Sequence, residues 1–195
     1  MLSEKEFIAL KLELSVRAKN GLDFIIAAGI IWTMIAGIWA LPNSPGRHSF
    51  LTLFTGGLML PLAWLFSRVL KTTWTIPGNP LQPLGLWLNF AQLFYFPLLI
   101  FGYAKQPQQF IMTYAIITGA HFFPYAWFYN VRAYAVAAGA IAVGSMLLGW
   151  NAAPEQLYRI PAFVAGALLV LGVFLVVSYR ANRGRYAPAG PGGAA

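Results

Sequence analysis

The chain has 195 residues, of which 59% are hydrophobic and 9% are charged, whereas soluble globular domains carry about 25% charged residues. This composition and a mean hydropathy of +0.65 exclude a water-exposed surface around the whole chain and predict one polytopic membrane domain, with the lipid bilayer as its partner. The net charge of +8 comes from basic residues near the ends of apolar segments, and this position favours lipid headgroups over nucleic acid as their partners. The absence of cysteine excludes disulfides and thiolate metal sites.

Residues 1–20 precede the first long apolar run and are predicted to form an amphipathic helix at the membrane interface. Ser3 and Glu6 have the spacing of a capping box, so we expect the helix to begin there. Apolar residues recur at helical spacing along this segment, and Glu6, Glu13 and Arg17 share a polar stripe. A helix packed under the bundle fits the same pattern, and a solvated segment with incidental apolar residues is the alternative.

Six apolar runs follow, each with about 18–21 residues, which is enough to cross a hydrocarbon core of roughly 30 Å. The predicted fold class is therefore all-α, a polytopic membrane protein with six transmembrane helices within residues 21–180. The Pro- and Gly-rich tail, residues 181–195, is expected to be disordered and cytoplasmic. The predicted spans are residues 22–41, 50–70, 84–103, 109–129, 133–150 and 160–179.

The basic residues predict the orientation of these spans. An even number of spans places both termini on one side, and that side would carry ten basic residues against three on the other. Because basic residues accumulate in cytoplasmic loops, we expect both termini in the cytoplasm and the protein in a bacterial inner membrane. The ten are Lys5, Lys11, Arg17, Lys19, Arg68, Lys71, Arg132, Arg180, Arg183 and Arg185, and the three are Arg47, Lys105 and Arg159.

The fourth run contains a histidine at membrane depth. His121 lies four residues before Tyr125, so both side chains project from one helix face, and Pro124 removes a helix hydrogen bond beside them. A histidine in this position could relay protons, or it could be a neutral side chain that is hydrogen-bonded to a neighbouring helix. No second histidine or carboxylate has suitable spacing on this helix, so we predict no metal site.

The third run contributes two amides. Asn89 and Gln92 lie three positions apart and share a helix face, so we expect interhelical hydrogen bonds from them and consider either a candidate partner for His121. Pro97 in this run, Pro61 in the second run and Pro124 in the fourth run are predicted to distort their helices.

Asp23 is an acidic residue at the edge of the first span, and three roles are open to it. It could favour the positive end of the helix dipole, it could pair with Lys19 or Arg132, or it could serve as a coupling-ion carboxylate.

Four short motifs stand out along the chain: KNGLDFI at residues 19–25, LPLA at 60–63, NPL at 79–81 and GAHFFPY at 119–125. Together they resemble DUF7010, an uncharacterised family of bacterial integral membrane proteins. The resemblance extends over about residues 19–150, and the motif around His121 is its most specific part. It implies a bacterial membrane protein and carries no assigned activity or functional residue.

The sequence contains no nucleotide-binding loop, serine triad, paired catalytic carboxylates or cofactor motif, so we predict no cofactor and favour a non-enzymatic role. The leading hypothesis is a small channel or transporter with a polar site between the third and fourth spans. The alternatives are a scaffold or accessory subunit, as a homo-oligomer or with a membrane protein partner, and a lipid-modifying enzyme with His121 as base. The predicted polar site consists of Asp23, Asn89, Gln92, His121 and Tyr125.

Overall fold

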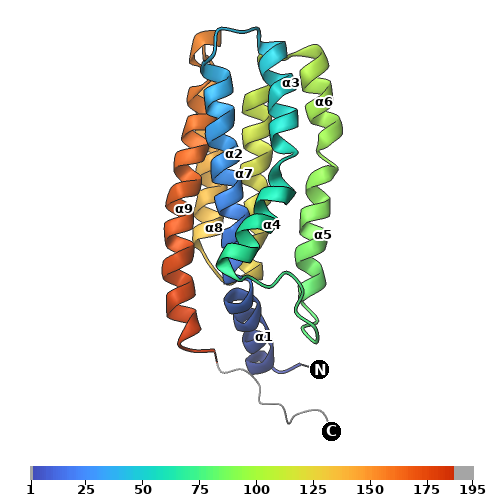
Figure 1. The fold of residues 1–195 in the computed structure, drawn as a ribbon, viewed down its shortest axis with the longest axis vertical. Helices are drawn as coiled ribbons and strands as arrows, with labels where there is room; N and C mark the ends of the chain where they lie inside the picture. Colours follow the sequence, from blue (N-terminus) through green and yellow to red (C-terminus); the bar gives the residue numbers. More distant parts are fainter. Residues whose placement is uncertain (1, 187–195) are drawn as a thin grey trace.

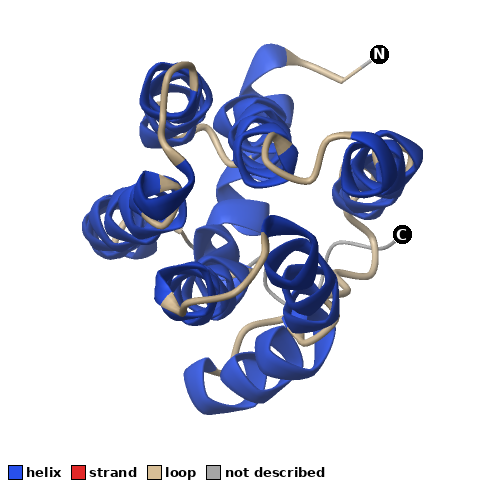
Figure 2. Cartoon of the chain, turned by 90° about the horizontal axis from the view of Figure 1, so that it is seen from above, coloured by secondary structure: helices blue, strands red, loops and turns tan. Residues whose placement is uncertain are grey.

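The computed structural model describes residues 2–186, which fold entirely into helices and turns without a β-strand (Figures 1 and 2). The all-α class predicted from composition is therefore confirmed. The helices are α1 (Glu4–Arg17), η1 (Lys19–Gly21), α2 (Leu22–Ala40), α3 (Pro45–Gly56), α4 (Met59–Leu70), α5 (Gln82–Leu93), α6 (Phe96–Lys105), α7 (Phe110–Phe128), α8 (Ala133–Gly149), η2 (Pro154–Gln156) and α9 (Arg159–Arg183).

Several of these helices are long and apolar enough to cross a membrane. α8 is a shorter apolar helix, and α7, which carries two threonines, a histidine and a proline, is not among these candidates. By length and composition the candidate membrane spans within residues 2–186 are Lys19–Ala40, Pro45–Leu70, Gln82–Lys105 and Pro154–Arg183.

Two ends of the predicted spans differ from the structure by four or five residues. α3 begins at Pro45, not at residue 50, because the Ser44 side chain caps it by accepting from the Arg47 N–H, and proline suits the first helical position. His48, which precedes the second predicted span, is therefore a buried helical residue whose Nε2 lies 3.1 Å from the Leu41 carbonyl. At the other end α9 continues to Arg183, three residues into the segment expected to be disordered, while residues 187–195 lie outside the described residues.

The second and third apolar runs are each divided into two helices near mid-height of the bundle (Figure 1). Residues 57–58 separate α3 from α4, and residues 94–95 separate α5 from α6. Pro61 and Pro97 follow these interruptions, and since proline has no N–H, the carbonyls of Gly57 and Leu93 lack the donor that an intact helix would supply. α7 by contrast runs without interruption through Pro124.

The core of the bundle is formed by α2, α7, α8 and α9, and its closest helix pair is α7 with α8. Gly119 makes this approach possible, since a Cβ at that position would lie 2.8 Å from the backbone nitrogen of Ala142 and 2.9 Å from Ile141 Cγ2. Backbone atoms of a packed helix cannot move aside cheaply, so this glycine fixes the distance between the two helices.

Replacing Gly119 with alanine is therefore expected to lower the free energy of unfolding by about 1–3 kcal/mol through overpacking. The matched control is Gly139→Ala on α8, where a Cβ meets no atom within 4 Å and the change slightly favours the helix. Thermal unfolding in detergent should show a lowered midpoint for the first variant only. Equal midpoints would mean that the α7–α8 contact is looser than described.

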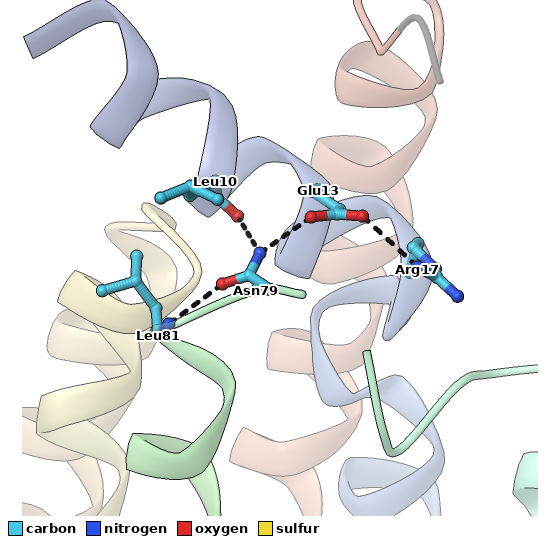
Figure 3. A network of polar contacts seen from close by, with 5 residues as sticks. All are labelled: Leu10, Glu13, Arg17, Asn79 and Leu81. Atoms are coloured by element: carbon cyan, nitrogen blue, oxygen red, sulfur yellow. Dashed lines mark hydrogen bonds and ion pairs between the residues drawn. The ribbon is translucent and has the colours of Figure 1, made fainter. Parts of the chain in front are cut away.

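A network of polar contacts attaches α1 to the loop between α4 and α5, residues 71–81 (Figure 3). The buried Asn79 amide nitrogen donates to the Leu10 carbonyl at 3.0 Å and to Glu13 Oε2 at 2.9 Å, while its oxygen accepts from the Leu81 N–H at 3.0 Å. Glu13 also forms an ion pair with Arg17 at 3.3 Å. Asn79, part of the NPL motif, therefore joins α1 to the start of α5.

The N-terminal helix begins as the sequence predicts and packs against the base of the bundle. Ser3 and Glu6 form both halves of the capping box, and hydrogen bonds from Ser3 hold the pKa of the Glu6 carboxyl below its usual value. The buried Lys11 ammonium lies 4.2 Å from the centre of the Trp127 ring, and loss of water there lowers the pKa of this amine. α1 is thus packed under the bundle (Figure 1).

The α5–α6 pair is the least buried part of the bundle. It packs on α7 and, through α6, on α3. Of the residues in its most apolar stretch, 6% are buried, whereas 50% are buried in the stretch that contains α2. Leu99 is the only residue of α5 and α6 with a fully buried side chain. Side chains of this pair therefore face outward from the protein over most of its length.

Candidate functional site

One face of α7 carries a line of polar side chains. Tyr114, Thr118, His121 and Tyr125 are spaced by four, three and four residues, so they lie above one another on a helix of 3.6 residues per turn. We call these four residues the α7 polar stripe. His121 and Tyr125 were predicted from the sequence, whereas Tyr114 and Thr118 were missed, although their spacing from His121 could have identified them.

The stripe meets the third apolar run at Asn89. The Tyr125 hydroxyl donates to Asn89 Oδ1 at 3.0 Å, and His121 Nε2 lies 3.5 Å from the same hydroxyl. Because a tyrosine hydroxyl has one proton, His121 must donate from Nε2 in this arrangement, which leaves Nδ1 as an acceptor. Asn89 in turn donates to the carbonyl of Gly85 at 3.0 Å, so the donors form a directed chain from His121 to α5.

Gln92 lies on the same side of α5 but forms no side-chain hydrogen bond within residues 2–186. Its side chain and that of His121 are half-buried, and Asn89 is exposed. The structure therefore brings Asn89, His121 and Tyr125 into contact and places Gln92 one turn along from Asn89. Together they form a polar surface between α5 and α7 with hydrogen-bonding capacity left over.

The upper part of the stripe reaches the interruption between α3 and α4. A Cβ at Gly56 would lie 2.9 Å from the Tyr114 hydroxyl oxygen, so this glycine lets the tyrosine approach the end of α3. Thr118 is 5% exposed, and its hydroxyl has no hydrogen-bond partner in the described part of the chain. An unpaired buried hydroxyl between two polar side chains is a place where a polar ligand or water would gain a partner.

A second polar cluster lies at the base of the bundle, around Asn20. This residue is fully buried in a left-handed conformation (φ 57°), and its side chain accepts from Ser15 Oγ at 2.6 Å and donates to the Leu175 carbonyl at 3.2 Å. Its own carbonyl accepts from the Tyr134 hydroxyl at 2.6 Å, and Asn182 donates to Ser15 at 3.0 Å. The KNG part of the first motif therefore ties α1, α8 and α9 together.

Asp23 belongs to this base and not to the stripe. Its buried carboxylate accepts from Thr72 Oγ1 and from Trp74 Nε1, both at 2.7 Å, and from the Phe24 N–H at 3.1 Å. The two ion pairs considered for it, with Lys19 and Arg132, are not formed: Lys19 instead donates to the Leu70 carbonyl. Asp23 thus joins the start of α2 to the 71–81 loop.

Tyrosine rings connect the two clusters. Tyr125 stacks on Tyr129 with ring centres 6.0 Å apart, and Tyr129 stacks on Tyr134 at the same distance. Tyr125 therefore has its hydroxyl in the stripe and its ring in a stack that ends at the Asn20 carbonyl.

The chemistry available to the stripe is hydrogen bonding by uncharged groups. It offers hydroxyls, an imidazole and the amide of Asn89. None of its hydrogen bonds involves a carboxylate, a lysine or an arginine. Among residues 2–186 no three histidine or carboxylate side chains come close enough together to hold a metal ion. The uncharged donors and acceptors of the stripe suit binding of a polar molecule.

Comparison with known proteins gives the family and nothing further. Residues 7–178 match the model of a family of unknown function, DUF7010, which is wider than the segment over which the motifs suggested the resemblance. No curated protein and no solved structure matches the chain. Since the match extends over most of its length, the chain belongs to the family of unknown function DUF7010.

Proposed function

We propose that this protein is a six-span membrane transporter that moves a small molecule bearing hydroxyl or amide groups past the α7 polar stripe. The observation that carries the proposal is the unsatisfied hydrogen-bonding capacity of the stripe. Thr118, Gln92 and the Nδ1 atom of His121 have no partner within residues 2–186, although all three lie within apolar helices. Unpaired polar groups at membrane depth are costly, and they usually mark a substrate path.

The interrupted helices beside the stripe also support transport. Non-helical backbone at membrane depth is tolerated where it is buried in protein or lines a cavity, and many transporters bind their substrates at such breaks. Here the α3–α4 interruption lies against Tyr114, and the α5–α6 interruption follows shortly after Gln92. The carbonyls of Gly57 and Leu93 add two acceptors to this region.

For the membrane arrangement, we propose six spans: α2, α3–α4, α5–α6, α7, α8 and α9. The ends of α1 and α9 lie at the same end of the bundle, as an even number of crossings requires (Figure 1). That end carries Lys71, Arg132 and Arg183, so the distribution of basic residues supports a cytoplasmic location for both termini in a bacterial inner membrane.

Flux through purified protein in vesicles tests the proposal. We would measure proton flux with an enclosed pH dye, swelling in neutral polyols, and the accessibility of labelled lipids to a membrane-impermeant quencher. We expect flux of one of these probes above that of empty vesicles. His121→Ala and Tyr125→Phe should each lower it about tenfold, the effect of losing roughly 1.4 kcal/mol of differential binding.

The control is Leu169→Ala, a residue that is 72% exposed on α9 and makes no contact with the stripe, and its flux should equal that of wild type. Absence of flux for every probe would contradict the proposal. Normal flux with His121→Ala would contradict the role of the stripe. A scaffold role would be supported if the variants lost only thermal stability and the protein co-purified with a stoichiometric membrane partner.

A further inference from the structure

The edge of the polar site at Asn89 lies at the boundary between the bundle and the space around it. Asn89 is exposed although its oxygen accepts from Tyr125 in the bundle. Leu86, three residues before it, is 55% exposed, and Leu93, four residues after it, is 53% exposed. Because residues at these spacings share a helix face, the amide lies between two outward-facing leucines.

The free hydrogen-bonding groups at this edge include both donors and acceptors. Asn89 uses one amide hydrogen for Gly85 and one lone pair for Tyr125, which leaves one of each. His121 Nδ1 offers an acceptor, and the Gln92 amide offers both kinds of group. With no charged side chain in the hydrogen bonds of this site, an uncharged group that both donates and accepts, such as a hydroxyl, fits better than an ion.

The packing of α5 explains how such a group would arrive. α5 packs mainly on α7, and none of its side chains is fully buried. A molecule that approaches along Leu86 and Leu93 would therefore reach Asn89 from the side of the bundle without passing through the core. If the proposed spans are correct, that side faces lipid acyl chains.

We propose that the site takes an amphiphile with an uncharged hydroxyl head, of which a diacylglycerol is the simplest example, and that this ligand enters sideways from the bilayer. The head hydrogen-bonds to Asn89 and His121, and an acyl chain lies along Leu86 and Leu93. This inference rests on the proposed function, for which it names the substrate class.

Photocrosslinking tests the inference on the full-length protein. Leu93→p-benzoylphenylalanine places a photoreactive group beside Asn89, and the protein is reconstituted in phosphatidylcholine vesicles with equal minor fractions of dioleoylglycerol and phosphatidylglycerol. Mass spectrometry of the crosslinked protein gives the lipid captured. We expect dioleoylglycerol at about five- to tenfold its share of the bilayer, the ratio that two hydrogen bonds in a membrane would produce.

Two controls separate site binding from general contact with lipid. The same probe at Leu169 on α9 should capture lipids at their bulk ratio. Adding Asn89→Leu to the Leu93 probe should return capture to that ratio, and circular dichroism would verify that this variant is folded. Bulk-ratio capture at Leu93, or enrichment of phosphatidylglycerol instead, would overturn the inference.

The outcome is distinguishable from failure of the proposed function. Stripe-dependent flux of a polyol or proton, with bulk-ratio capture at Leu93, would leave the transporter proposal standing and remove the amphiphile. Enrichment that depends on Asn89, without flux of any probe, would keep the binding site and contradict transport.

Discussion

Replacing Asn20 with alanine is expected to lower the free energy of unfolding by about 3–4 kcal/mol. The left-handed backbone at this position costs alanine about 1 kcal/mol more than asparagine or glycine. The buried side chain also loses its bonds to Ser15 and to the Leu175 carbonyl, each worth about 1–3 kcal/mol when a buried group is left unpaired. Thermal or denaturant unfolding in detergent measures the loss.

Asn20→Gly is the matched control, because it relieves the backbone but still removes the side chain. It should recover about 1 kcal/mol of the alanine variant's loss and no more. If the glycine variant were as stable as wild type, the side-chain bonds at the base would contribute nothing. If alanine itself were tolerated, both the buried geometry and the backbone conformation assigned to Asn20 would be wrong.

Replacing Asp23 with alanine is expected to cost about 3 kcal/mol and to release the 71–81 loop. The carboxylate is held by Thr72 and Trp74, and charge-assisted hydrogen bonds contribute about 1.5–3 kcal/mol each. Once these bonds are lost, the backbone after the exposed Lys71 becomes accessible to protease. Limited trypsin digestion should therefore cleave the variant after Lys71 faster than wild type.

Cleavage after Arg185, beyond the end of α9, serves as the internal standard and should be unchanged. Asp23→Asn keeps the shape and one acceptor oxygen, so it should lie between the alanine variant and wild type in both stability and cleavage. Unchanged cleavage after Lys71 in Asp23→Ala would show that the loop is held by Asn79 and the α1 contacts alone.

The sequence predicts most helix ends well, because hydrophobicity and local capping decide them. The first and fifth runs agree with α2 and α8 to within one residue at each end. The start of α3 was missed because the apolar run begins later than the cap at Ser44. Pro61, Pro97 and Pro124 were all predicted to distort their helices. Pro61 and Pro97 follow interruptions, whereas Pro124 lies within an uninterrupted helix that packs extensively on α8.

Local spacing also predicted part of the candidate site. His121 and Tyr125 share a face of the fourth run, and Asn89 lies on the third run. These three residues were therefore expected to lie near one another. The partners of Asp23 were not predictable, because Thr72 and Trp74 are about fifty residues away in a loop whose path depends on the finished bundle. Nothing in the sequence neighbourhood of Asn20 shows that this residue is buried.

Two hydrogen bonds join the N-terminal segment to the last helix, and they affect the order in which the protein assembles during synthesis. Asn20 binds the carbonyl of Leu175, and Ser15 binds Asn182, over separations of 155 and 167 residues. Synthesis proceeds from the N-terminus at about 5–20 residues per second, so these polar side chains have no partner on α9 until that helix has been translated and inserted. The contact between the N-terminal segment and α9 is thus completed only at the end of synthesis, and a chain that ends before α9 would leave Ser15 and Asn20 without these partners.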